Sequence, residues 1–148
     1  MKHQGSKCDY AEERNNDLMR AFVEEIENCD NIVLPQVLSR VVNKPSKRFW
    51  VSAERAAIVV SSMMRGNTLE NMHYSERREM FQEIYRRVIA LKEKYPHKSI
   101  YELTCQVVYE PAPKFYLTTG SAKVFIHRTK KLWHLKNMQR LRYSQSQQ

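Results

Sequence analysis

The sequence predicts an all-α protein, in which two tandem three-helix units are related by an internal repeat and pack as one small helical protein. Three observations predict this class. The segment 41–52 recurs 66 residues later, at 107–118. Apolar residues recur at helical spacing, and strand-like alternation is not sustained along the 148 residues. Only 3 Gly and 5 Pro occur, with 42% hydrophobic residues, which argues against a disordered or loop-rich chain.

The repeat aligns without a gap, and its paired positions share a physical character: Arg48 with Lys114, Trp50 with Tyr116, and Ser52 with Thr118. The same register continues with Ala56 and Ala122, Ile58 and Val124, and Val60 and Ile126. Upstream, residues 17–19 match residues 79–81 only if the second copy carries four more residues before its next helix. We therefore predict a flexible N-terminus (1–9), a first repeat (10–66), a linker (67–73), a second repeat (74–142) and a disordered tail (143–148).

Three helices are expected in the first repeat. The first helix presents one apolar face, formed by Leu18, Met19, Phe22, Val23 and Ile26. A second helix covers 34–42, because Pro35 is tolerated in a first turn and Pro45 stops the helix. Ser52 then caps a third helix over 53–64, since its oxygen can accept a free amide hydrogen.

The second repeat follows the same order. Its first helix presents Met80, Phe81, Ile84, Tyr85, Val88 and Leu91 on one face. Its second helix starts at the capping box formed by Ser99 and Glu102, and Pro111 stops it. Thr118 caps a longer third helix, expected over 119–141.

Each repeat has a bend before its third helix, in which a Pro precedes a basic residue and two aromatic residues. Phe49 and Phe115 are predicted to plug the core. Arg48 and Lys114 have no packing role, so we expect them to lie exposed beside the N-terminus of the third helix. Free amides and the helix dipole favour an anion there, so the bend suits a phosphate; the alternative is a solvated loop charge.

Three helices with a bend between the second and third resemble helix-turn-helix and homeodomain-like DNA-binding units. The resemblance is one of pattern, covers both repeats and implies that the third helix enters the major groove. About nine residues separate the second and third helices, whereas the usual turn has three or four.

Charge is distributed unequally along the chain. Residues 1–110 contain 17 Lys or Arg and all 16 acids, a net charge of +1, whereas residues 111–148 contain 8 basic residues and no acid, a net charge of +8. Most of the excess falls on the last predicted helix, at Lys123, Arg128, Lys130, Lys131, Lys136, Arg140 and Arg142. A helix of one charge sign gains no pairing along its own surface, so this pattern favours a polyanionic partner over a merely solvated tail.

Other residue patterns exclude several classes of function. Cys8, Cys29 and Cys105 form no C-x-x-C pair, which argues against a disulfide framework and indicates a reducing compartment. The 5 His form no zinc motif, and we expect no metal or cofactor. No phosphate-binding loop or nucleophile elbow is present, so an enzyme is not expected. Neither a secretory signal nor a membrane span is expected, which predicts a cytoplasmic location, with nucleoid association in a bacterium.

The predicted function is non-enzymatic nucleic-acid binding, with duplex DNA favoured over RNA. Base contacts are expected from Thr119, Ser121 and Lys123, beside the cap Thr118, and from Glu54 and Arg55 in the first repeat. The first repeat has little charge excess, so it either reads bases weakly or binds a protein.

Two alternatives remain open. The chain could be a helical subunit of a larger nucleoprotein complex, holding RNA by stacking near Trp133, or holding a protein partner. Peripheral membrane binding through the basic helix ranks lower, because its apolar residues are expected to cover the core.

Overall fold

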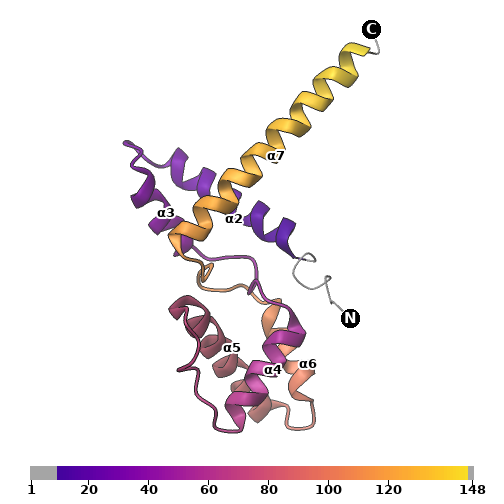
Figure 1. The fold of residues 1–148 in the computed structure, drawn as a ribbon. Helices are drawn as coiled ribbons and strands as arrows, with labels where there is room; N and C mark the ends of the chain where they lie inside the picture. The colour runs from indigo at the N-terminus through magenta and orange to yellow at the C-terminus, as the bar shows by residue number, and fades with distance from the viewer. Residues whose placement is uncertain (1–9, 147–148) are drawn as a thin grey trace.

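The computed structural model describes residues 10–146, with only the backbone of Ser146, and this part of the chain is all-helical (Figure 1). The helices are α2 (Ala11–Glu27), α3 (Leu34–Val42), α4 (Ala53–Met64), α5 (Ser75–Lys94), α6 (Ile100–Val108) and α7 (Thr119–Ser146). The predicted all-α class is confirmed. Between residues 10 and 146, no helix has an apolar stretch long enough to cross a bilayer.

The helices form two lobes, each with its own apolar core (Figure 1). In the α2–α3–α7 lobe the fully buried side chains include Leu18, Val37 and Val41. In the α4–α5–α6 lobe they include Phe81, Ile84 and Leu103. These residues lie on the apolar faces that helical spacing predicts.

Each lobe takes its third helix from the other half of the chain. α4 packs on α5 and α6, and α7 packs on α2 and α3. The predicted segments 10–66 and 74–142 therefore do not each enclose a core. The packing also differs from a helix-turn-helix formed by consecutive helices, because α3 and α4 make no contact with each other. The long bend between them carries the chain across to the second lobe.

The two bends cross, and hydrogen bonds join them at positions 66 residues apart. Ser46 and Ala112 form an antiparallel bridge in which each amide donates to the other carbonyl at 3.0 Å. The amide of Phe49 donates to Val108 O, and the amide of Phe115 donates to Val42 O, both at 3.0 Å. Each bend is thus bonded to the end of the other repeat's second helix.

Successive aromatic residues of each bend point into different lobes. Phe49 lies in the core of the α4–α5–α6 lobe, and Trp50 lies in the core of the α2–α3–α7 lobe. The assignment reverses in the second bend, where Phe115 joins the α2–α3–α7 lobe and Tyr116 the other. Phe49 and Tyr116 stack with their ring centroids 6.0 Å apart. The predicted burial of both Phe side chains is confirmed.

Burial follows the offset of 66 beyond the bends. Ala56 and Ala122 are buried, as are Val60 and Ile126, whereas Ile58 and Val124 are exposed. In the first helices, Leu18 and Phe22 fall 66 residues before Ile84 and Val88, all buried, although sequence matching alone needed four extra residues there. The internal duplication remains a prediction. The structural observation that agrees with it is the equal burial of residues 66 positions apart.

The predicted caps of both third helices are present. Ser52 Oγ accepts from the amide of Arg55 at 3.1 Å, and Thr118 Oγ1 accepts from the amide of Ser121 at 3.0 Å. α7 continues to Ser146, past the predicted end at residue 141 and into the segment expected to be a disordered tail. No Gly or Pro follows Gly120 to end the helix. The predicted flexible N-terminus, residues 1–9, lies outside the described residues.

Candidate nucleic-acid interface

The second half of α7 projects away from both lobes (Figure 1). Ala122, Ile126 and Thr129 are the buried positions of this helix, at the spacing of one helical face. Beyond them, every residue from 130 to 145 is exposed. The packing of α7 on α2 and α3 therefore ends after about three turns, where the Nζ of Lys130 lies 4.6 Å from the centroid of the Phe22 ring. Beyond Lys130 the helix presents its whole circumference.

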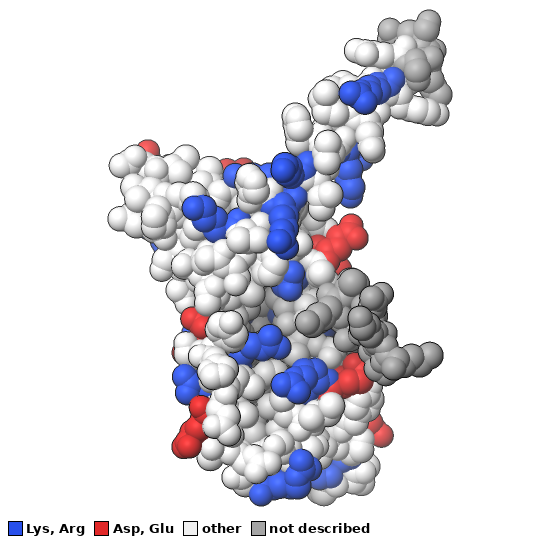
Figure 2. Space-filling model, viewed as in Figure 1, with Lys and Arg blue, Asp and Glu red and all other residues white. Residues whose placement is uncertain are grey.

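The exposed cations of α7 have no acidic partners among the described residues. Lys123, Arg128, Lys130, Lys131, Lys136, Arg140 and Arg142 are all exposed, and none lies within ion-pair distance of a described carboxylate. Elsewhere cations pair, as Arg20 does with Asp17 at 2.7 Å and Arg87 with Glu83 at 3.0 Å. Lys and Arg side chains follow the projecting helix in Figure 2, with no acidic side chain on its outer part in that view. The projecting half of α7 is thus a basic surface without internal neutralisation.

Large apolar side chains are interleaved with these cations. Leu132, Trp133, Leu135 and Leu141 are between 42% and 60% exposed. The expectation that the apolar residues of the basic helix cover a core is wrong for these four side chains. It holds only for the first turns, where Ile126 is buried and Phe125 packs partly against the core.

The residues predicted to contact base edges are divided between the lobes. Thr119 and Lys123 are exposed on the first turns of α7. Ser121 is half-buried, and its hydroxyl accepts from Thr118 Oγ1 at 3.0 Å. Arg55 is exposed on α4, in the other lobe, and neighbouring Glu54 accepts from the Tyr101 hydroxyl at 3.3 Å.

Arg48 and Lys114 differ from the expectation of free, exposed cations. Both are half-buried. Arg48 donates to Val51 O at 2.8 Å and to Phe49 O at 3.1 Å, and its guanidinium carbon lies 4.1 Å from the centroid of the Tyr109 ring. Lys114 forms an ion pair with Glu79. Arg48 thus donates to two carbonyl groups of its own bend, of which Phe49 O also accepts from the amide of Val51 at 2.9 Å. Both cations are therefore engaged within the protein.

Sequence reasoning missed four residues that the structure brings forward. Asn137 and Gln139 are exposed amides on the projecting half of α7, and such side chains can bond an adenine edge in a major groove. Arg14 and Trp50 line a cavity between the lobes. Asn137 and Gln139 could be found from the sequence, because they are amides on a helix predicted to be basic. Arg14 and Trp50 could not, because they come together only where the bends cross.

The described residues contain no cluster of three or more His, Cys, Asp or Glu that could hold a metal ion. Cys29 and Cys105 are free thiols, each half-buried. Arg40 Nη2 lies 3.2 Å from Cys29 Sγ. His3 and Cys8 lie outside the described residues.

Comparison with family models, with curated proteins and with solved structures finds no match for this chain. The geometry of the chain is therefore the basis for its functional interpretation.

Proposed function

We propose that this protein is a non-enzymatic nucleic-acid-binding protein that binds duplex DNA through the projecting half of α7. One observation carries the proposal: this half of the helix is exposed on all sides and bears cations that no described carboxylate neutralises. Like charges on one helix repel each other, and a polyanion removes that cost while releasing its own counterions. This role implies a cytoplasmic location, with nucleoid association in a bacterium.

The distribution of charge around α7 supports insertion into a groove. Lys131 and Arg140 are nine residues apart, about two and a half turns, and so lie on opposite faces of the helix. An α-helix with side chains is about 10–12 Å across, and the major groove of B-DNA is about 12 Å wide with phosphates on both walls. Cations on opposite faces can reach both walls, while the amides of Asn137 and Gln139 remain available to bases.

The same distribution disfavours a membrane surface. Leu132 and Leu141 are also nine residues apart and lie on opposite faces, so apolar and basic residues are not segregated. A helix lying in a lipid interface buries one apolar face and holds its cations on the other. In a major groove the separate apolar side chains can instead contact thymine methyl groups.

The two lobes contribute unequally in this proposal. In the α2–α3–α7 lobe, α7 stands in the position of a third helix against two supporting helices, which gives a composite form of the helix-turn-helix-like unit. The α4–α5–α6 lobe offers Arg55 beside Glu54, with no comparable run of unneutralised cations. We therefore assign DNA binding to the α2–α3–α7 lobe and the capacity to bind a protein partner to the α4–α5–α6 lobe.

RNA or single-stranded nucleic acid is the alternative, and the exposure of Trp133 favours it. An indole that is 42% exposed on a basic helix can stack on an unpaired base. Competition separates the two possibilities. Unlabelled duplex displaces a labelled duplex at lower concentration than single-stranded DNA or RNA of equal length if the groove proposal holds, and the order reverses if stacking dominates.

The salt dependence of binding tests the basic helix itself. Affinity for a labelled duplex is measured from 50 to 200 mM salt for the wild type and for the K130A/K131A double variant. Each lost phosphate contact lowers the slope of log K against log salt by about 0.9, so the double variant should lose nearly two units. The matched control is R65A/K94A, which removes the same charge from exposed positions of the other lobe. An unchanged slope in K130A/K131A removes α7 from the interface.

A further inference from the structure

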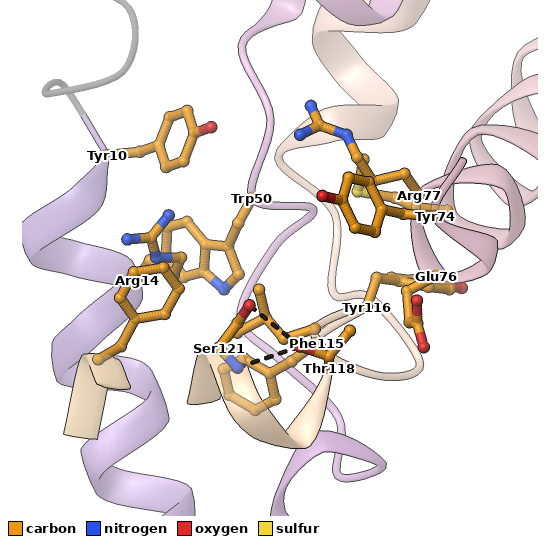
Figure 3. Close-up of a pocket in the computed structure, with 13 residues that line it drawn as sticks. Tyr10, Arg14, Trp50, Tyr74, Glu76, Arg77, Phe115, Tyr116, Thr118 and Ser121 are labelled. Carbon is orange, nitrogen blue, oxygen red and sulfur yellow. Dashed lines mark hydrogen bonds between the residues drawn. The ribbon is translucent and has the colours of Figure 1, made fainter. Parts of the chain in front are cut away.

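A cavity of about 290 Å³ lies between the two lobes, where the bends cross (Figure 3). The start of α2, both bends, the start of α5 and the first turn of α7 line it. Its volume is close to the lower end of the range for small-molecule sites, about 300–1,000 Å³. It is separate from the projecting half of α7, which contributes none of its lining residues.

The indole of Trp50 lines this cavity with an unused donor. Trp50 is 9% exposed, and its Nε1 is buried without a hydrogen-bond partner among the described residues. In Figure 3 the edge of the indole that carries the nitrogen faces the side on which Thr118 and Ser121 lie. A buried donor left unpaired costs roughly 1–3 kcal/mol, so this atom indicates a missing acceptor.

Arg14 supplies a cation without a carboxylate partner. Its guanidinium carbon lies 3.9 Å from the centroid of the Phe125 ring, and its Nε donates to Asn15 Oδ1 at 3.3 Å. No described Asp or Glu forms an ion pair with it. Burial lowers the pKa of the Arg14 guanidinium below its ordinary value, and the nearby Tyr10 opposes this shift without cancelling it.

The N-terminus of α7 adds donors on the same side. Thr118 and Ser121 line the cavity, and the amide of Ser121 is bonded to the Thr118 cap. No described acceptor receives the amides of Thr119 and Gly120, which belong to the same turn but do not line the cavity. A Cβ placed on Gly120 would meet only Thr118 Oγ1, at 3.9 Å, so the approach to this turn is open. The dipole of this long helix favours an anion at its first turn.

Aromatic rings form much of the remaining wall: Tyr10, Tyr74, Phe115, Tyr116 and Phe125. Such rings favour a planar ligand, which they can contact by stacking or by their edges. Among the described residues that line the cavity, Arg77 is a second cation, and Glu76 is the one carboxylate. Glu76 can accept hydrogen bonds from ligand hydroxyl or amino groups, at a distance from the cationic side that Arg14 provides.

We propose that this cavity binds a nucleoside monophosphate, with the phosphate at Trp50 Nε1, Arg14 and the first turn of α7 and the base among the aromatic side chains. A phosphate has enough acceptor oxygens for the cation, the indole N–H and the open amides, whereas a carboxylate has fewer. The nucleotide can be free in solution or an unpaired nucleotide of a bound strand, since both present the same groups. This site does not rest on duplex binding by α7.

The fluorescence of Trp50 reports directly on the site. The chain has 2 Trp, so W133F, at an exposed position, leaves Trp50 as the only indole. Titration of W133F with adenosine monophosphate should change the emission in a saturable way. Adenosine alone and inorganic phosphate alone should each bind at least about tenfold more weakly, because each lacks half of the contacts. Equal binding of phosphate alone, or no saturable change with the nucleotide, overturns the proposal.

Arg14→Met in the W133F background tests the cation while keeping an apolar side chain against Phe125. Affinity for adenosine monophosphate should fall about tenfold or more, the usual effect of losing a hydrogen bond to a charged group. Arg65→Met, an exposed position of the other lobe, should leave it unchanged. Equal affinity in Arg14→Met and Arg65→Met contradicts the assignment. If Arg14→Met does not fold, the indole N–H resonance of Trp50 in W133F gives the answer, since nucleotide must shift it downfield.

Two further experiments are needed. One distinguishes a free nucleotide from an unpaired nucleotide of a bound strand, and the other distinguishes the cavity site from binding by α7. A duplex with one unpaired nucleotide that displaces adenosine monophosphate indicates the strand as source, and failure to displace it indicates the free nucleotide. K130A/K131A should retain full affinity for adenosine monophosphate even though its duplex binding weakens. Loss of nucleotide binding in K130A/K131A places the nucleotide on α7 and overturns the cavity assignment, while leaving the proposed function in place.

Discussion

Ser46 and Ala112, 66 residues apart, exchange two backbone hydrogen bonds of 3.0 Å where the two bends cross. The buried hydroxyl of Ser46 adds bonds to both bends, to Arg48 O at 2.8 Å and to Lys114 O at 3.3 Å. The two bends cross at this contact, and beyond it each third helix packs against the first two helices of the other repeat. The folding of each lobe therefore depends on both halves.

The exchange predicts that the two halves of the chain fold only together. Fragments 1–70 and 71–148, divided in the exposed segment between α4 and α5, should each show little helix by circular dichroism. Each fragment alone lacks the helix that completes its lobe, so its apolar faces stay open to water. An equimolar mixture should regain the helical signal and melt cooperatively. A cooperative transition in either fragment alone contradicts this dependence.

Phe49→Ala and Phe115→Ala should each lower the free energy of unfolding by about 3–5 kcal/mol, because each leaves a large cavity in a small core. The two rings are 0% and 2% exposed. Denaturant unfolding measures the loss, and Ile58→Ala, at a side chain that is 61% exposed, should change it by less than about 0.5 kcal/mol. Hydrogen exchange should show Phe49→Ala loosening α5 and α6 first, although Phe49 belongs to the first half of the sequence. Earlier loosening of α2 and α3 is the contrary result.

Truncation after Thr129 should separate stability from function. No residue from 130 to 145 is buried, so the melting temperature should change by only a few degrees. Affinity for duplex DNA should fall to the level of a weak, nonspecific contact, because the cations from Lys130 onward are gone. Retention of wild-type affinity by the truncated chain contradicts the proposed function.

Tyr116 predicts a loss of stability at high pH. Burial, with the nearby Glu83 carboxylate second, raises the pKa of the Tyr116 phenol to about 12, above its ordinary value of about 10. The folded state therefore holds this proton more tightly than the unfolded state. Its contribution is fully present below pH 10 and is lost as the pH rises to 12, at a cost of roughly 1–2 kcal/mol.

Tyr116→Phe tests this pH dependence, because it keeps the ring and removes the titrating hydroxyl. The free energy of unfolding of the wild type should fall more steeply between pH 10 and 12 than that of Tyr116→Phe, and the two curves should run parallel below pH 10. Parallel curves throughout would assign the alkaline loss to other groups. Tyr85→Phe, at a partly buried position of α5, provides the matched control.

Local chemistry was sufficient to predict the helices. Pro45 and Pro111 stop the second helices, Ser52 and Thr118 cap the third ones, and the apolar spacing marks the buried faces. The bounds 34–42 and 53–64 agree with α3 and α4. These features depend on neighbours within about four residues, which is why the sequence by itself determined them.

The basic character of the last helix was also determined by the sequence, since charge needs no tertiary information. The sequence did not determine which side chains of this helix are exposed and which are packed against the lobe. The structure shows that Phe125 and Ile126 pack against α2 and α3, whereas Trp133 and Leu135 are exposed, because the lobe ends after the first turns of α7. Likewise Arg48 is a cation in the sequence, but only the bend's geometry brings its guanidinium to Val51 O.

Only the tertiary structure decided which helix completes which core. The third helices of the two repeats carry equivalent apolar faces, at Ala56 and Val60 in one and at Ala122 and Ile126 in the other, so either pair could cover either lobe. Hydrophobic burial is non-directional and does not distinguish them. The extended bends and the Ser46–Ala112 bridge select the exchanged arrangement, and the same crossing brings Arg14, Trp50 and the first turn of α7 around one cavity.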